Sequence, residues 1–433
     1  MPPVYRLSAL LEPLRASFTR PTFDNFCVLV YGWLLARRHT VCGCLLAVGP
    51  RATKHFATYH RTLAAARWAA DAVGLTLAAL ILDLCPQTVC GAALDDTTTS
   101  HPGRRVWGTG YHRDAVRSKP ARNVWCRGHC WVVLCLVIPV PHCRRKFALP
   151  VLCRLYLNAQ TAAQLKLEHH TKPELGLALV EAVAARFPQQ RFHLYGDANY
   201  GGESLLARLP ETFDLSSRLM PQTALHQPVE HRPRRRGRPA KRGPRLPGLA
   251  QWVQRRARRR RAMLYGHAVW VAPVAGRACL HRVPQRVVQV LVVKPRNPAD
   301  KPQFFYTTAL QLRPEQVLEG IADRWPIETC FWECKQQLGL EQPQCRARRA
   351  VERTTPLAFW CYSLTVLWYV AGGHREGIPQ PPPWYPQKTC PSFADMLALL
   401  QGQCRQEYLT PWSAPREAHN SGPPQPPSLP WAA

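Results

Sequence analysis

Long apolar runs are missing from this sequence. The longest, Trp131–Val140 and Leu357–Gly372, are too short or too polar for the roughly 18–20 residues that a membrane span needs. A hydrophobic secretory signal is also missing after Met1, so we expect the protein to work in a reducing cytosol. These absences argue against a membrane protein and against a secreted one.

Paired Cys-x2-Cys motifs are absent too, although the sequence contains 17 cysteines. The spacing within Cys126–Cys135 and between Cys330 and Cys334 is poor for zinc. The sequence therefore predicts mostly buried thiols. The alternative is a zinc site built from Cys126, His129, Cys130, His142 and Cys143.

Acidic residues are scarce: the 433 residues include 27 Asp and Glu against 57 Lys and Arg. The formal net charge of +30 favours a polyanionic partner, with nucleic acid ahead of an acidic membrane surface. A basic protein without such a partner is the alternative. The chain is long enough for two or three domains and a sizeable core.

The residue pattern divides the chain into five segments. Residues 1–85 are expected to form short helices with basic ends, either a DNA-binding region or an ordinary helical cap on the next domain. Residues 86–220 and 301–373 alternate strand-like and helix-like stretches, which predicts an α/β layer structure. Residues 221–300 read as a basic, partly β insertion, and residues 374–433 as a Pro-rich tail with one short helix.

Two of the predicted strands end in an acidic residue. The first covers residues 88–95 and ends at Asp95, which is followed by Asp96; the second covers residues 191–197 and ends at Asp197. Ligand and metal sites in such sheets lie near strand ends, so the two acids can be neighbours despite their separation in sequence. Side-chain alternation favours Asp95 over Asp96 weakly, and Asp96 stays the alternative.

A third acid lies on a helix that is expected to begin at Pro326. Arg324, Glu328, Phe331 and Lys335 fall at i, i+4, i+7 and i+11, which places them on one face. A carboxylate between two cations suits a phosphate bound beside a metal ion. An exposed helix with an i,i+4 salt bridge is the alternative.

Asp95, Asp197 and Glu328 could together form a metal site. Hard cations such as Mg²⁺ or Mn²⁺ prefer oxygen ligands, which these carboxylates offer. Two ions held there could activate a water or a 3′-hydroxyl and stabilise the leaving oxygen of a phosphodiester displacement. Arg324 and Lys335 would then bind the DNA backbone as cations.

Residues 231–247 carry many cations among Pro and Gly and are not expected to form a packed element. The segment Arg236-Gly237-Arg238-Pro239 has the form of an AT-hook, whose arginines can enter a narrow minor groove. Lys241 and Arg242 continue this candidate DNA-binding stretch. The alternative is a solvated loop without a specific role.

Three segments resemble the DDE transposases of bacterial insertion sequences, in the group described as DDE superfamily endonucleases. They are Leu94-Asp95-Asp96-Thr97, Tyr195-Gly196-Asp197-Ala198-Asn199-Tyr200 and Arg324-Trp325-Pro326-Ile327-Glu328. In that family a Tyr-x2-Arg-x3-Glu-x6-Lys signature surrounds the third acid. This sequence keeps Arg324, Glu328 and Lys335 at that spacing but has Ile321 in place of the tyrosine. The Asp-x-Thr order typical of ribonuclease-H-like enzymes also favours Asp95.

The resemblance covers about residues 20–370 and implies a ribonuclease-H-like mixed sheet with flanking helices. It implies a transposase that uses two Mg²⁺ or Mn²⁺ ions, cuts double-stranded DNA at transposon ends and joins the 3′-hydroxyls to target DNA. It also implies a homodimer in the synaptic complex and a location in the bacterial cytosol, at the nucleoid. The alternatives are a nuclease without strand transfer and a catalytically inactive DNA-binding regulator.

Overall fold

The computed structural model describes residues 6–103, 105–114, 117–119, 121–229, 240–254, 260–297, 300–376 and 383–409. Its strands are β1 (Val89–Ser100), β2 (Gly110–Arg113), β3 (Trp125–Ile138), β4 (Phe147–Tyr156), β5 (Arg191–Gly196), β6 (Phe213–Leu219), β7 (Leu225–His226), β8 (Arg260–Leu264), β9 (His267–Leu280), β10 (Val283–Pro295) and β11 (Gln303–Thr307). Its α-helices are α1 (Leu7–Leu11), α2 (Arg20–Leu35), α3 (Val41–Val48), α4 (Phe56–Ala64), α5 (Ala70–Leu84), α6 (Ala159–Gln164), α7 (Lys172–Arg186), α8 (Glu203–Arg208), α9 (Leu249–Gln254), α10 (Pro314–Ala322), α11 (Pro326–Gln337), α12 (Arg348–Ala371) and α13 (Phe393–Cys404).

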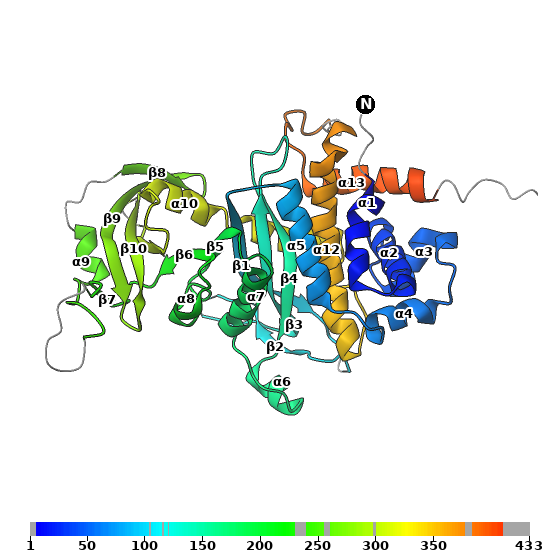
Figure 1. The fold of residues 1–433 in the computed structure, drawn as a ribbon, viewed down its shortest axis with the longest axis horizontal. Helices are drawn as coiled ribbons and strands as arrows, with labels where there is room; N and C mark the ends of the chain where they lie inside the picture. The colour runs from blue at the N-terminus through cyan, green and yellow to red at the C-terminus, as the bar shows by residue number, and fades with distance from the viewer. Residues whose placement is uncertain are drawn as a thin grey trace, which may run out of the picture.

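One mixed sheet connects the strands of the described residues, in the order β2-β3-β1-β5-β6-β11-β10-β9-β7, with β4 on β3 and β8 on β9. Strand β1 is antiparallel to β3 and parallel to β5, and β5 is parallel to β6. The part β4-β3-β1-β5-β6, flanked by helices, has the ribonuclease-H-like arrangement, so the expected fold class is confirmed (Figure 1).

Strand β1 extends beyond the acid at which it was expected to end. Its parallel pairing with β5 stops at Leu94, opposite Gly196, whereas its antiparallel pairing with β3 continues to Ser100. Residues 96–100 therefore continue the strand, because β3 still supplies hydrogen-bond partners there. Asp95 is the first residue of β1 beyond the end of β5, next to the turn that begins at Asp197.

Strand β4 was not foreseen, because Pro150 argues against a strand with neighbours on both sides. Within the described residues, β4 pairs only with β3 and has a register irregularity at this proline. Side chains of α12 satisfy the carbonyls there: Ser363 Oγ donates to Pro150 O at 2.8 Å, and Trp360 Nε1 donates to Val151 O at 3.1 Å. An adjacent helix thus protects the edge strand.

Helix α12 is apolar on nearly all sides and runs through the interior between the sheet and the N-terminal helices (Figure 1). It contacts β4 and α5 on one side and α2 and α4 on the other. Phe26, Trp68 and Trp360 pack together across this boundary, with ring centroids 6.2–6.5 Å apart. The N-terminal helices therefore share one hydrophobic core with the sheet.

The expected insertion forms the second lobe of the structure (Figure 1). Strand β11 pairs with β6 on one side and β10 on the other, so the sheet runs from the first lobe into the second. A separate cluster joins β8–β11 to α10, with Val271, Leu291 and Leu318 fully buried. Strand β9 continues through Pro273, and its pairing with β10 is irregular beside this proline, as at a β-bulge.

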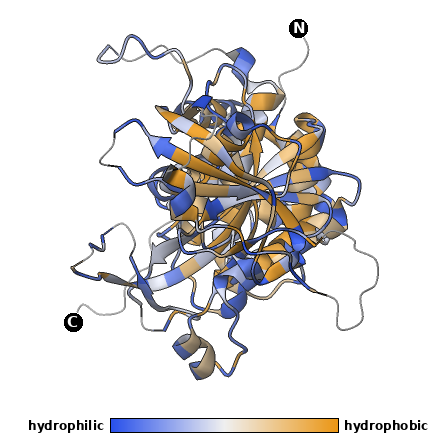
Figure 2. Ribbon diagram, turned by 90° about the vertical axis from the view of Figure 1, so that its left-hand side faces the viewer, coloured by the Kyte–Doolittle hydropathy of each residue, from blue (hydrophilic) through white to orange (hydrophobic). Residues whose placement is uncertain are grey.

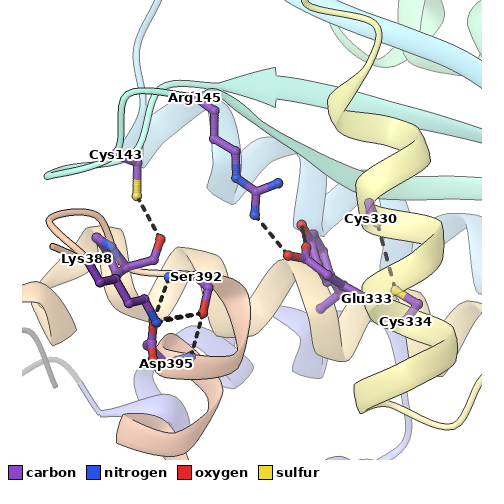
Figure 3. A network of polar contacts seen from close by, with 10 residues as sticks. Cys143, Arg145, Cys330, Glu333, Cys334, Lys388, Ser392 and Asp395 are labelled. Carbon is purple, nitrogen blue, oxygen red and sulfur yellow. Dashed lines mark hydrogen bonds and ion pairs between the residues drawn. The ribbon is translucent and has the colours of Figure 1, made fainter. Parts of the chain in front are cut away.

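The helix expected within the Pro-rich tail is present as α13, and it belongs to the core. Phe393 is buried and stacks on Tyr362 of α12, with ring centroids 4.3 Å apart. Figure 3 shows the polar contacts of this region: Cys143 Sγ donates to the carbonyl of Pro391 at 3.6 Å, and Ser392 and Lys388 hold Asp395. The chain from 383 to 409 is thereby packed against the loop before β4.

Apolar residues concentrate along the central strands and the helices beside them, and polar residues lie at the loops (Figure 2). Among the described helices, none is long and apolar enough to cross a membrane.

Candidate active site

The adjacent acids of β1 contact different partners, as expected for successive residues of a strand. Asp95 Oδ2 accepts a hydrogen bond of 2.6 Å from Arg324 Nη1. Asp96 accepts bonds of 2.6 Å from Lys172 Nζ and 2.8 Å from the hydroxyl of Tyr200. Asp95 is thus the acid of this pair that is linked to α11.

Asp197 follows β5 directly and organises the turn between β5 and α8. Its Oδ1 accepts backbone N–H bonds from Asn199 at 2.9 Å and Tyr200 at 3.0 Å. Its carbonyl oxygen accepts from Gly201 N and from Ser217 Oγ, both at 2.8 Å. The carboxylate is held at the end of β5 while one of its oxygens has no described hydrogen-bond donor.

Glu328 lies in the first turn of α11, where a negative charge is favourable. Arg324, four residues earlier, donates to Glu328 Oε1 at 2.6 Å through Nη2, while its Nη1 contacts Asp95. One guanidinium group therefore joins the acid of β1 to the acid of α11. Lys335, at the other end of this helix, donates to the carbonyl of Thr98 at 2.7 Å, so α11 runs along β1.

Burial dominates the electrostatics of Asp95. Desolvation raises the pKa of its carboxyl group to about 7; the cation of Arg324 opposes this shift and the nearby charge of Asp197 reinforces it. The influence of Asp197 shows that these two acids are electrostatic neighbours although they come from different strands. A positive charge placed between them would stabilise the ionised state of both.

The donor set fits a hard cation in its chemistry, since it offers carboxylate oxygens from β1, β5 and α11. The guanidinium group of Arg324 already stands between two of these carboxylates, as a cation would. In this arrangement, however, no three acidic, His or Cys side chains within the described residues are grouped closely enough to hold a metal ion. Arg324 takes up the space between Asp95 and Glu328.

The cations expected at DNA are distributed over several places. Arg324 and Lys335 are both bound within the protein, as described above. Lys241 is exposed, and Arg242 contacts the ring of His281 at 2.6 Å. Arg236 and Arg238 of the AT-hook-like segment lie outside the described residues.

A groove of about 670 Å³ lies between the loop before β4, the turn after β8 and the start of α11, the helix that carries Glu328. Arg144, Arg145 and Lys146 line one side, and the exposed rings of Tyr265 and Trp325 line the other, with centroids 6.0 Å apart. Arg145 is anchored by an ion pair of 2.9 Å to buried Glu333 (Figure 3). Lys146 is paired with Asp323, which also lines the groove, at 2.6 Å. The sequence analysis missed these lining residues, since they are separated from the candidate acids along the chain.

The sequence model of the family described as DDE superfamily endonuclease matches residues 13–268. The chain belongs to the DDE superfamily endonucleases. The match includes Asp95 and Asp197 and ends before Glu328. No curated protein matches the sequence. A nuclease or transposase type of activity on DNA follows from the family, whose domains generally use divalent metal ions.

The cysteines of this DDE endonuclease are all free thiols. Cys130 Sγ lies 3.4 Å from Asp96, whereas Cys143 contacts the carbonyl of Pro391. His129 is buried and its Nε2 lies 2.8 Å from the carbonyl of Trp107. The residues of the alternative zinc site are thus engaged elsewhere, and burial raises the pKa of the Cys130 thiol to about 12.

The sequence analysis also missed Tyr200 and Lys172, the partners of Asp96. Tyr200 follows Asp197 by only three residues, in the same turn, so the sequence could predict that it lies near that acid. The sequence could not predict its contact with Asp96, because the pairing of β1 with β5 creates that contact.

Proposed function

We propose that this DDE endonuclease is a transposase, which cuts at transposon ends with Mg²⁺ or Mn²⁺ and joins the freed 3′-hydroxyls to target DNA in the bacterial cytosol. The arrangement of Asp95, Asp197 and Glu328 carries the proposal. These acids come from two neighbouring strand ends and one helix, and they are linked by charge and by the guanidinium group of Arg324.

Each acid has a distinct role in this proposal. Asp95 and Asp197 hold two divalent ions from the ends of β1 and β5, and Glu328 contributes a ligand from α11. Asp96 is the less favoured first acid, because its carboxylate is bonded to Lys172 and Tyr200, whereas Arg324 joins Asp95 to Glu328. Bound divalent ions supply Lewis-acid activation of a water or 3′-hydroxyl and stabilise the leaving oxygen.

The cations bind the DNA. Arg324 would bind a backbone phosphate once Asp95 and Glu328 held a metal ion in its place, and Lys335, which now donates to the carbonyl of Thr98, would bind the DNA backbone as a second cation. Arg144 supports this direction of approach: it lines the groove beside α11, and its side chain forms no ion pair within the described residues. Arg236, Arg238, Lys241 and Arg242 provide additional contacts to DNA. Joining two ends requires two active sites, so we expect a homodimer in the synaptic complex.

The test is a reaction of the full chain with duplexes that carry the ends of its own element, a target plasmid and Mg²⁺. The proposal predicts strand breaks at the element boundary and covalent joining of the ends to the plasmid. Breaks without joined products would identify a nuclease without strand transfer. Binding without breaks in either Mg²⁺ or Mn²⁺ would identify an inactive regulator and would reject the enzymatic assignment.

A further inference from the structure

Asp96 stands at the centre of a second polar cluster, on the opposite side of β1 from Arg324. Its Oδ2 accepts from Lys172 Nζ at 2.6 Å and lies 3.4 Å from Cys130 Sγ. Its Oδ1 accepts from the hydroxyl of Tyr200 at 2.8 Å. The cluster therefore connects β1, β3, the first residue of α7 and the turn after β5.

Tyr200 is the residue that links the two candidate metal-binding acids. Its backbone N–H donates to Asp197 Oδ1 at 3.0 Å, while its hydroxyl donates to Asp96, the residue next to Asp95. The distance between the turn and β1 is therefore spanned by one rigid aromatic side chain. A change at either end of Tyr200 would alter how Asp95 and Asp197 face each other.

The ring of Tyr200 has little freedom to move. It is fully buried, and it packs against α7 at Gly176, where an added Cβ would lie 3.2 Å from the ring. The next residue, Gly201, leaves no room for a side chain, because a Cβ there would lie 1.7 Å from Ser217 Oγ. Tyr306 also holds this turn by donating to the carbonyl of Gly201 at 2.6 Å. The turn is fixed from three directions.

Lys172 donates to Oδ2 of Asp96, the carboxylate oxygen that Tyr200 does not contact. Burial disfavours the charge of its ammonium group, but Cys130 and Asp96 raise its pKa to about 12. The ammonium group is therefore charged at neutral pH, and its bond to Oδ2 helps to orient the carboxylate whose Oδ1 accepts from Tyr200. Each oxygen of Asp96 thus already accepts a hydrogen bond from a side chain.

We propose that Tyr200 is a positioning residue that, through Asp96 and Lys172, sets the separation of Asp95 and Asp197 for divalent-metal binding. This inference rests on the proposed function. Residues that orient metal ligands without touching the metal typically change metal affinity by about 10–100-fold when they are altered. Tyr200 and Lys172 have this relation to the acids of this protein.

The test measures binding of Mn²⁺ to the full chain by electron paramagnetic resonance of the free ion. Tyr200→Phe keeps the buried ring and removes only the hydroxyl, so we expect a stable protein that binds Mn²⁺ roughly 10–100-fold more weakly. DNA cleavage by this variant should recover when Mn²⁺ is raised to saturation. A residue with a purely structural role would lower the melting temperature without this specific rescue.

Tyr195→Phe is the matched control. Tyr195 belongs to β5, where its ring stacks on His193, and its hydroxyl forms no hydrogen bond within the part of the chain that the structure describes. Its removal should leave Mn²⁺ binding unchanged. Lys172→Met tests the same cluster from α7 and should weaken binding in the same direction, with less than additive loss when combined with Tyr200→Phe.

Wild-type affinity for Mn²⁺ in both Tyr200→Phe and Lys172→Met would overturn the inference and leave the proposed function standing, provided that the wild-type protein binds the ion and cuts DNA. A wild-type protein that neither binds Mn²⁺ nor cuts DNA would overturn the proposed function and the inference together.

Discussion

At the residue scale, the proposed metal chemistry depends on the proton of Asp95. Burial raises the pKa of this carboxyl group to about 7, Arg324 opposes the shift, and Asp197 and Asp96 reinforce it. Because the folded-state pKa lies above the ordinary value of 3.8, protonated Asp95 favours the folded protein. This stabilisation is complete below about pH 4 and is lost as the pH rises through 7.

The same proton should control metal binding. Below pH 7 a divalent cation has to displace it, so we expect the Mn²⁺ affinity of the full chain to rise about tenfold per pH unit toward pH 7 and then level off. Calorimetric titrations between pH 5.5 and 8.5 would measure this. Affinity that does not change across this range would show that Asp95 does not titrate there.

Glu328 and Arg324 illustrate which residue contacts the sequence could predict. Their i,i+4 spacing predicted a shared helix face, and the ion pair of 2.6 Å bears this out. The contact of Arg324 with Asp95 depends on how α11 lies along β1, which local spacing does not encode. The sequence analysis assigned Arg324 to a phosphate, with an i,i+4 salt bridge to Glu328 as the alternative, and did not anticipate its contact with Asp95.

At the scale of elements, α12 unites the parts of the fold. Arg353 of this helix is buried and donates to the carbonyls of Leu63 at 3.0 Å and Trp68 at 2.5 Å, and its guanidinium carbon lies 4.3 Å from the centre of the Trp68 ring. The helix is thereby bound to the segment that joins α4 to α5.

Arg353→Met should reduce the free energy of unfolding by about 2–5 kcal/mol, since it removes these bonds and leaves two buried carbonyls without donors. Arg348→Met is the control in the same helix: its exposed ion pair with Glu352 should contribute less than about 1 kcal/mol. Urea denaturation of both variants measures the difference. Equal losses would mean that Arg353 does not hold the N-terminal helices on α12.

The elements also show why some strands could be predicted and others could not. Strand β3 was recognised from its apolar run, and β5 from its position before Asp197. Strand β4 was missed because Pro150 is tolerated only where a strand is an edge, and edges are set by tertiary structure. Strand β2 begins only at Gly110, after Gly108, whose φ of +76° interrupts the extended stretch before it.

At the scale of the whole molecule, the five expected segments are less independent than the sequence suggested. Apolar residues of α2 and α5, of the central strands and of α13 belong to one core. Composition marks the basic insertion clearly, but it does not reveal that β11 continues the same sheet into it. Long-range pairing, which no local window contains, decides both points.

The excess of positive charge should determine how the whole protein binds DNA. If Lys241 and Arg242 each neutralise a phosphate, replacing both with Ala should reduce the slope of log affinity against log salt by about 1.8. Arg208→Ala is the control, since this cation on α8 is paired with Glu181 at 3.1 Å. Filter binding at several salt concentrations would measure the slopes, and an unchanged slope would remove both residues from the DNA interface.

The central claim is that acids from β1, β5 and α11 act together on a phosphodiester bond. Asp197→Asn tests it most directly, with Asp83→Asn, an exposed acid of α5, as the control. In Mg²⁺, with duplexes carrying the element's ends, we predict that Asp197→Asn binds DNA like the wild-type protein but cuts it more than about 100-fold more slowly, because altering even a group that only orients a metal ligand costs about 10–100-fold, whereas Asp83→Asn cuts normally. Cleavage at the wild-type rate by Asp197→Asn would contradict the account.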